Sequence, residues 1–142
     1  MRRVVVTGIG TINSTGHNVK DSFQAVVEGV CGIDTITLFD ASDFSVKIAG
    51  EVKDFDPTTV MDKKEVKKAD RFIQLGIKAA LEAMIDSGYV TQENKKVDAS
   101  IADRFGMISG SGIGGLSTIE RNSVVCETKG SRKVSPFFIP SS

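Results

Sequence analysis

The sequence contains few of the residues that catalytic and metal sites use most often. Its 142 residues include one histidine, two cysteines and no tryptophan. Two isolated cysteines cannot build a disulfide framework or a zinc site, so we expect reduced thiols in a cytoplasmic protein. The single histidine allows at most one Cys-His or Ser-His pair. The composition therefore favours neither metal binding nor nucleophilic catalysis by these residues.

Long apolar runs and an excess of charge are also absent. No stretch of 18 or more apolar residues occurs, and the three valines of MRRVVVTGIG are too few for a signal peptide. The 18 Lys and Arg residues balance the 18 Asp and Glu residues. A neutral chain has no long-range field that attracts nucleic acid or anionic membrane. We expect a globular protein that uses neither partner and that recognises a charged partner only through a local patch.

The apolar pattern predicts an α/β fold with parallel strands. Arg3–Thr7 is expected to form a strand buried on both faces, and residues 104–112 a second strand. Helices are expected over 18–32, 69–88 and 116–130. Gly29 or Gly32 would end the first helix, and Ser87-Gly88 would end the second. The order of these elements is typical of α/β domains. The closing segment SPFFIPSS is expected to be extended.

Two of these helices carry extensive apolar surface. The first has one apolar face, made of Val19, Phe23, Val26, Val27 and Val30. The second has two stripes, made of Ile73, Ile77, Ala80 and Met84 and of Phe72, Leu75, Ala79 and Ala83. A compact chain of this length should bury roughly two-thirds of its unfolded surface. A chain of this length nevertheless has few residues with which to cover both sides of the second helix.

The glycine loop SGSGIGG, residues 109–115, allows three interpretations. Gly110, Gly112 and Gly115 have the G-x-G-x-x-G spacing of a dinucleotide cradle, between an expected strand and an expected helix. However, the loop is not in the first strand-helix turn, and no acidic residue follows on a second strand. Ile113 also brings an apolar side chain to the loop. The loop could hold a phosphate, form a tight turn, or contact an acyl or other apolar ligand.

The remaining polar candidates have ordinary structural explanations. His17 lies in a turn before a helix, where it is expected to cap or face solvent. Cys126 has no nearby basic partner in sequence, and Cys31 lies in the packed stretch GVCGI, so both are expected to be structural thiols. Three aspartates near residue 57 lack the spacing of a calcium loop. They are Asp54, Asp56 and Asp62.

Lysines gather just before the second expected helix. Lys64, Lys67 and Lys68 follow the i, i+3, i+4 spacing, so a helix would place them on one face. Arg132 and Lys133 form a smaller basic pair. These residues are either an ordinary solvated helix end or a docking face for an acidic partner.

Five segments together resemble the type II β-ketoacyl-acyl-carrier-protein synthases in order and spacing. They are RRVVVTGIG, FDASDFSVKIAGEVKDFDP, KKEVKKADRFIQLGIKAALEAMIDSG, GMISGSGIGGLSTIE and SRKVSPFFIPSS. The resemblance implies a thiolase-like fold, with a mixed, mostly parallel sheet and flanking helices. Residues 1–142 would form part of its N-terminal half. Missing sequence or a second subunit would then cover the exposed helix faces.

The resemblance also implies a function. Such enzymes are homodimeric, cytoplasmic acyltransferases of fatty acid biosynthesis that need no cofactor. They condense an enzyme-bound acyl group with malonyl-acyl carrier protein and release carbon dioxide. The family's catalytic cysteine and two histidines are not recognisable here, so we expect an N-terminal fragment that is inactive alone. The alternatives are a non-catalytic carrier-binding or dimer-interface module and a nucleotide-binding α/β domain.

The resemblance assigns roles to individual positions. Ile113 would line the acyl pocket, and Phe138, with Phe137 beside it, would close that pocket. The docking surface for the acidic carrier protein would consist of Lys64, Lys67, Lys68, Arg132 and Lys133.

Overall fold

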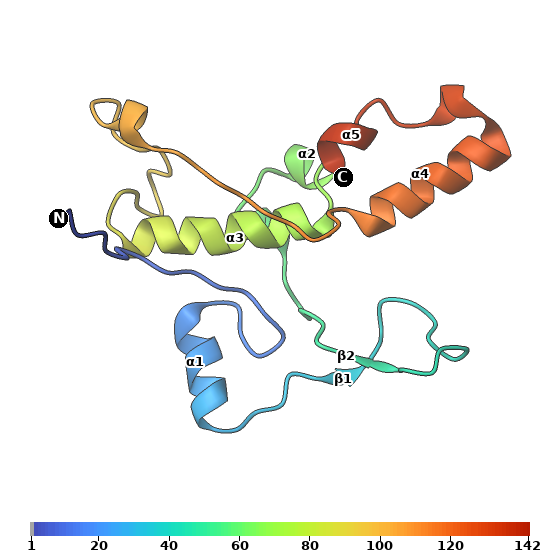
Figure 1. Ribbon diagram of the computed structural model, residues 1–142, viewed down its shortest axis with the longest axis horizontal. Coiled ribbons are helices and arrows are strands. Elements are labelled where there is room, and N and C mark those ends of the chain that lie inside the picture. Colours follow the sequence, from blue (N-terminus) through green and yellow to red (C-terminus); the bar gives the residue numbers. More distant parts are fainter. Residues whose placement is uncertain (1) are drawn as a thin grey trace. The chain divides into compact units, whose positions relative to one another are not determined.

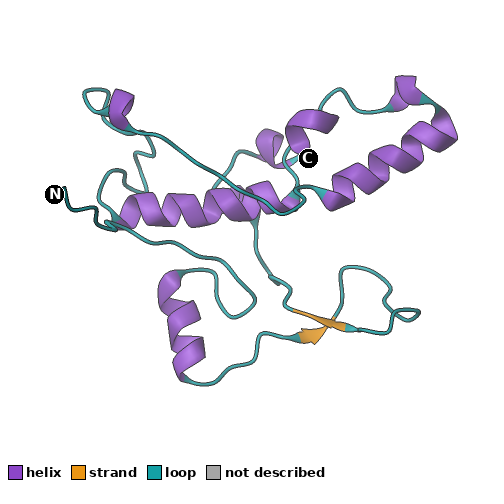
Figure 2. Cartoon of the chain, in the orientation of Figure 1, coloured by secondary structure: helices purple, strands orange, loops and turns teal. Residues whose placement is uncertain are grey.

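The computed structural model describes residues 2–142, which divide into two compact units (Figure 1). Unit 1 contains the described residues up to Asp56 together with Lys78–Lys96. Unit 2 contains Pro57–Ile77 and Val97–Ser142. Helices and loops make up most of both units, and Figure 2 shows strands only in the β1–β2 pair.

In unit 1, α1 (Val19–Val27) forms where the sequence predicts a helix. The Asn18 side chain caps it by accepting a hydrogen bond from the Asp21 N–H at 2.8 Å. The helix ends at Gly29, whose φ of 70° favours glycine. The Val30 N–H then donates to the Ala25 carbonyl at 2.8 Å, which closes a Schellman motif.

The strands differ from the prediction. In the described residues the sheet has two strands, β1 (Asp34–Thr35) and β2 (Ile48–Ala49), and they pair antiparallel. Neither Arg3–Thr7 nor 104–112 is a strand. A strand depends on backbone hydrogen bonds to a neighbouring strand, and the described residues supply none beside these segments. The described residues therefore do not form the expected parallel sheet.

The long helix α3 (Arg71–Asp86) confirms the helix predicted over 69–88, and Gly88 follows it with a φ of 77°. Its last two turns bind the N-terminal segment of unit 1 through two carboxylates. Glu82 accepts hydrogen bonds from the N–H groups of Thr11, at 3.1 Å, and Val19, at 2.7 Å. Asp86 accepts one from Ile9 N–H at 3.0 Å. The segment that leads into α1 is thereby fixed along this helix.

Unit 2 contains several short helices and one longer helix. Its elements are η1 (Pro57–Thr59), α2 (Lys63–Val66), the start of α3, η2 (Ala102–Arg104), α4 (Leu116–Lys129), η3 (Ser131–Lys133) and α5 (Phe138–Ser141). The helix predicted at α4 is confirmed, and it ends at Gly130 with a φ of 87°. None of the helices in the described residues combines the length and apolarity that a membrane span requires.

The closing segment SPFFIPSS is not extended, which corrects the prediction. Phe137 N–H donates to Ser135 Oγ at 3.1 Å, and Phe138 N–H donates to Ser135 O at 3.0 Å. These bonds start a turn that continues into α5. Pro140 lies in the first turn of this helix, where its missing N–H costs little.

The apolar core is small. Among the described residues the buried apolar side chains are Ala25, Ala41 and Val90. The chain exposes 11198 Å², whereas two compact bodies that share its mass equally would together expose roughly 8600 Å². About half of the unfolded surface is buried instead of the expected two-thirds. The predicted apolar face of α1 shows the difference, since Phe23 and Val26 are each 68% exposed.

Close backbone contact along α3 gives the first testable prediction. A Cβ atom at Gly10 would lie 2.7 Å from Ala83 N and closer still to Ala79 O. Gly10→Ala should therefore lower the free energy of unfolding by about 1–3 kcal/mol. A Cβ at Gly76, in α3, would meet nothing within 4 Å, so Gly76→Ala should raise stability by roughly 0.5–1 kcal/mol. Urea unfolding followed by circular dichroism measures both, and equal effects would contradict the contact.

Candidate functional site

An open apolar groove of about 480 Å³ lies in unit 2 beside the glycine loop. Its volume is within the range of small-molecule sites. Its lining side chains include Phe72, Ile73, Ile77, Met107, Ile113 and Ser142. The start of α3 supplies one wall, and Ile113, 72% exposed, supplies the apolar wall on the loop side. The structure therefore places Ile113 where an apolar ligand could contact it.

The first two glycines of the G-x-G-x-x-G spacing have open surroundings. A Cβ at Gly110 or Gly112 would meet nothing within 4 Å, and neither residue has a positive φ. Gly114, which is outside that spacing, has a φ of 86°. Its N–H donates to Ser111 Oγ at 3.0 Å, and this bond closes the turn. The backbone conformation of the loop therefore favours glycine at position 114.

The position of Asp70 explains why the third residue of the spacing, Gly115, is a glycine. Asp70 Oδ2 accepts a hydrogen bond from Thr118 N–H at 3.2 Å and a second from the Thr118 hydroxyl. A Cβ at Gly115 would lie 2.8 Å from the same oxygen. Gly115 supplies no side-chain cap to α4, so the Asp70 carboxylate serves as the cap.

This carboxylate argues against the dinucleotide interpretation. A pyrophosphate in such a loop binds the N–H groups at the start of the following helix. Here a negatively charged side chain already binds the first turn of α4 and would repel a phosphate. In the sequence, Asp70 lies only at the start of the helix predicted over 69–88. Its partner lies 48 residues away, and no local pattern signals such a contact.

The two phenylalanines expected to close the pocket lie elsewhere in unit 2. Neither Phe137 nor Phe138 lines the groove. Phe138 is half-buried in α5, whereas Phe137 is 49% exposed. The Lys68 ammonium lies 5.4 Å from the centre of the Phe137 ring, within cation–π range. The structure thus brings Phe137 to Lys68 and Ile113 to the groove.

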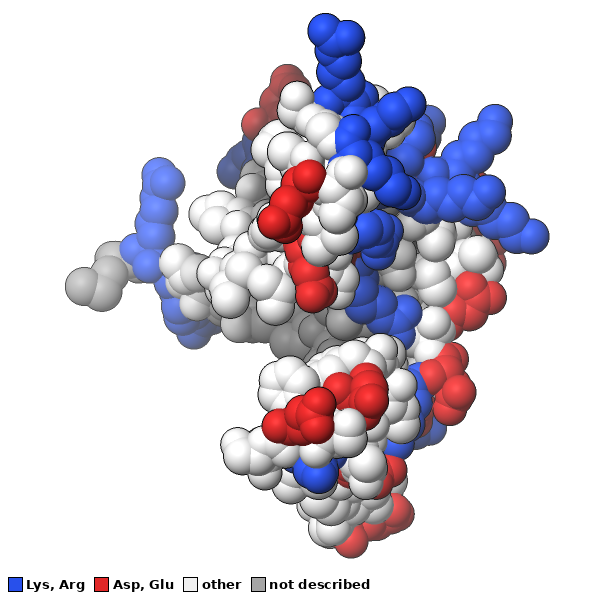
Figure 3. Space-filling view, turned by 90° about the vertical axis from the view of Figure 1, so that its right-hand side faces the viewer, with Lys and Arg blue, Asp and Glu red and all other residues white. Residues whose placement is uncertain are grey.

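The lysine cluster is defined as Lys64, Lys67 and Lys68. All three side chains are exposed, with Lys64 inside α2, Lys67 at its C-terminal end and Lys68 in the turn that follows. The buried Gln74 side chain fixes that turn, because its N–H group donates to the carbonyls of Val66 at 3.2 Å and Ala69 at 2.9 Å. Figure 3 shows Lys and Arg side chains gathered on the upper half of the face in view.

Charge is divided unevenly between the units of this neutral chain. Unit 2 has ten Lys or Arg residues against seven Asp or Glu residues. The predicted docking residues Arg132 and Lys133 belong to this unit, lie in η3 and are exposed. Unit 2 therefore carries a net positive charge, and a docking role for these residues stays a prediction.

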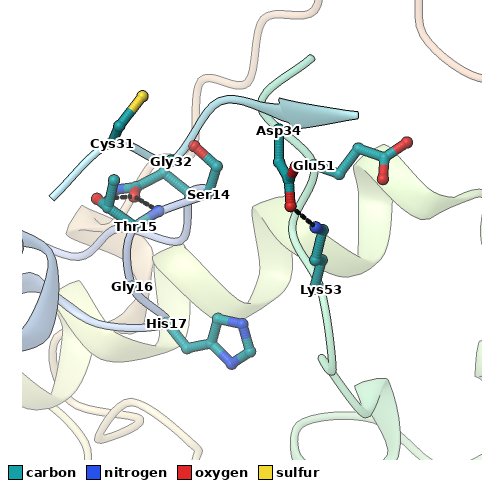
Figure 4. Close-up of a pocket in the computed structure, with 10 residues that line it drawn as sticks. Ser14, Thr15, Gly16, His17, Cys31, Gly32, Asp34, Glu51 and Lys53 are labelled. Atoms are coloured by element: carbon teal, nitrogen blue, oxygen red, sulfur yellow. Dashed lines mark hydrogen bonds and ion pairs between the residues drawn. The ribbon is translucent and has the colours of Figure 1, made fainter. Parts of the chain in front are cut away.

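Unit 1 contains a separate polar pocket of about 260 Å³ (Figure 4). It is lined by both His17 and Cys31, which could have formed a nucleophile and base. The Cys31 thiol instead donates to the Ile33 carbonyl at 3.8 Å, and in Figure 4 it points away from the His17 ring. His17 packs edge-on against Phe55, with ring centres 6.1 Å apart. These two residues do not form a catalytic pair.

The charged groups of the polar pocket also bind one another. Lys53 Nζ lies 2.7 Å from Asp34 Oδ2, and this bond lowers the pKa of Asp34 and raises the pKa of Lys53. Glu51 accepts hydrogen bonds from the Thr37 hydroxyl at 2.7 Å and N–H at 3.0 Å, which lower its pKa. Within residues 2–142 no group of three or more His, Cys, Asp or Glu side chains could hold a metal. The groove is therefore the better candidate site.

A nucleotide titration tests whether the Asp70 carboxylate prevents phosphate binding at the start of α4. NADH and NADPH, followed by their fluorescence, should give no saturable signal with the protein. Asp70→Asn keeps an oxygen acceptor but removes the negative charge, and should bind inorganic phosphate more tightly than the unsubstituted protein does. Saturable nucleotide binding by the unsubstituted protein would contradict the interpretation.

Comparison with known proteins assigns the family. The family model "Beta-ketoacyl synthase, N-terminal domain" matches residues 1–142. Proteins named 3-oxoacyl-[acyl-carrier-protein] synthase 2 are similar over nearly the whole chain, with 50% identity over 99% of it in Vibrio harveyi and 46% over 98% in Coxiella burnetii. The chain spans 32% of each of these relatives.

A solved structure agrees with this assignment. The ishigamide ketosynthase/chain length factor superposes with a TM-score of 0.75 and 27% sequence identity. The match covers 99% of this chain and 34% of that one. The ketosynthase neighbour supports a thiolase-like α/β fold, although the described residues contain only a two-stranded sheet. On the family model and these relatives, the chain belongs to the β-ketoacyl synthase family.

Proposed function

We propose that these residues act as part of a 3-oxoacyl-[acyl-carrier-protein] synthase of fatty acid biosynthesis. The reaction joins an enzyme-bound acyl group to malonyl-acyl carrier protein and releases carbon dioxide, without a cofactor. Relatives with this name align over nearly the whole chain. The observation that carries the proposal is the apolar groove bordered by Ile113. The nucleophile and the proton-transfer groups would come from outside residues 1–142.

The groove suits an acyl chain better than a polar ligand. Its walls are mainly aliphatic and aromatic, and the charged Asp70 carboxylate is engaged by Thr118. An acyl chain gains about 0.8 kcal/mol for each CH₂ group that it buries. Ile113, at the loop wall, would set how much chain the groove accepts. Phe138 and Phe137 would close the acyl pocket only in the complete protein, since neither lines the groove here.

The exposed apolar segments support a larger assembly of the thiolase-like type. Val4 and Val6 are 94% and 82% exposed, and Ile108 is fully exposed. In the complete protein, Arg3–Thr7 and 104–112 would become strands of a mostly parallel sheet buried on both faces. Further sequence and a second copy in a cytoplasmic homodimer would cover the remaining apolar surface.

Acyl carrier protein is the proposed partner of the basic surface on unit 2. That surface comprises the lysine cluster with Arg132 and Lys133. An acidic carrier would be steered toward it by complementary charge, which raises the association rate more than the final affinity. The contact between Lys68 and Phe137 would restrain the position of that ammonium group.

The role of Ile113 can be tested in the synthase that contains these residues. The assay measures condensation of acyl primers of different lengths with malonyl-acyl carrier protein. Ile113→Phe fills the groove and should lower kcat/KM for long primers by tenfold or more, at ~1.4 kcal/mol per factor of ten. Short primers should be affected little. Residues 1–142 alone should give no product.

Ile113→Leu is the matched control, because it keeps the volume of the side chain. It should preserve the chain-length preference. If the Ile113→Phe enzyme kept its chain-length preference, Ile113 would not be part of the acyl pocket. Product formed by the 142 residues alone would contradict the proposal that the catalytic groups lie elsewhere.

Charge reversal tests the docking surface. Replacing Lys64, Lys67 and Lys68 by glutamate should raise the KM for acyl carrier protein about tenfold or more at low salt, since attraction becomes repulsion. The difference should shrink as salt screens the charges. Reversing three exposed lysines of unit 1 is the matched control, namely Lys20, Lys95 and Lys96. Equal KM values for the two triple variants would rule out this docking surface.

A further inference from the structure

We propose that Asp70 is a positioning residue that holds the Ile113 wall of the groove and thereby limits the acyl chain that fits. This inference rests on the proposed function of the groove. Asp70 directly precedes α3, whose first turns supply Phe72 and Ile73 to the opposite wall. One side chain thus connects the two elements that border the groove.

The first step of the argument is the bond between Asp70 and α4. One carboxylate oxygen accepts both the N–H and the hydroxyl of Thr118. Thr118 is 9% exposed, so water has little access to these bonds. Hydrogen bonds to an ionised acceptor are stronger than those between neutral groups. Asp70 therefore anchors the first turn of α4 to the start of α3.

The second step is the short distance from this anchor to the groove. Gly115 lies against Asp70 Oδ2, and Ile113 precedes it by two residues. Gly114, between them, approaches Phe72, because a Cβ there would lie 3.6 Å from Phe72 Cζ. The Ile113 backbone cannot move far from the α3 wall while the Asp70–Thr118 bonds are intact.

The third step concerns the two ends of the loop. Gly110 and Gly112 have open space around them, so contacts restrain the start of the loop weakly. The end of the loop has the Asp70 anchor. The Asp70 N–H also donates to the Ser141 carbonyl at 3.3 Å, next to Ser142 in the groove lining. Asp70 consequently fixes two parts of the groove.

Asp70 acts through its neighbours and does not line the groove itself. It is therefore a positioning residue and is not expected to touch the acyl group. Loss of the anchor should let the Ile113 wall retreat from α3. A wider groove would accept long primers more readily than before, with little change for short primers.

The experiment compares variants of the intact synthase with primers of 8 and 16 carbons. Asp70→Ala should shift the ratio of kcat/KM values toward the longer primer by roughly tenfold, through KM more than kcat. Asp70→Asn keeps an acceptor for Thr118 and should restore most of the original ratio. Thr118→Val removes the hydroxyl donor and should shift the ratio in the same direction as Asp70→Ala. General damage to the fold would instead lower kcat for both primers.

Asp62→Ala is the matched control. Asp62 also precedes a helix, α2, but its side chain makes no cap hydrogen bond. This variant should keep the original ratio. An Asp70→Ala or Thr118→Val enzyme that folds, judged by its melting temperature, and keeps the ratio within twofold overturns the positioning role. If the unsubstituted synthase extends neither primer, the proposed function fails instead.

Discussion

Carboxylates at the two ends of α3 hold the backbone of other segments, and much of the structure depends on these bonds. At the C-terminal end, Glu82 and Asp86 bind N–H groups of the N-terminal segment of unit 1. Just before the N-terminal end, Asp70 binds the first turn of α4 in unit 2. Because few apolar side chains are buried, these directional bonds fix positions that a large core would otherwise fix.

The small number of buried apolar side chains has a functional explanation. Monomeric proteins rarely expose contiguous apolar patches of more than a few hundred Å², and larger patches mark surfaces that bind other protein. Val4, Phe23 and Ile108 are all more than half exposed. The family relatives are about three times the length of this chain. The proposal that further sequence covers these side chains would account for both observations.

The glycine loop shows how one sequence pattern can serve different chemistries. The spacing of Gly110, Gly112 and Gly115 is compatible with a phosphate cradle, and so is the helix that follows. The charge at the start of that helix distinguishes the possibilities. With the Asp70 carboxylate bound there and Ile113 at the groove, an apolar ligand is favoured over an anionic one.

The sequence by itself determined α1, α3 and α4, the family and the basic cluster. These features depend on residues close together in the chain, such as the periodic apolar positions of α3 or the glycines Gly29 and Gly88. Only the tertiary structure decided whether the two expected strands form, because a strand needs a partner strand that local sequence does not specify. It alone brought Asp70 to Thr118 across 48 residues and Phe137 to Lys68 across a longer separation. Such contacts follow from the path of the chain, which apolar periodicity does not encode.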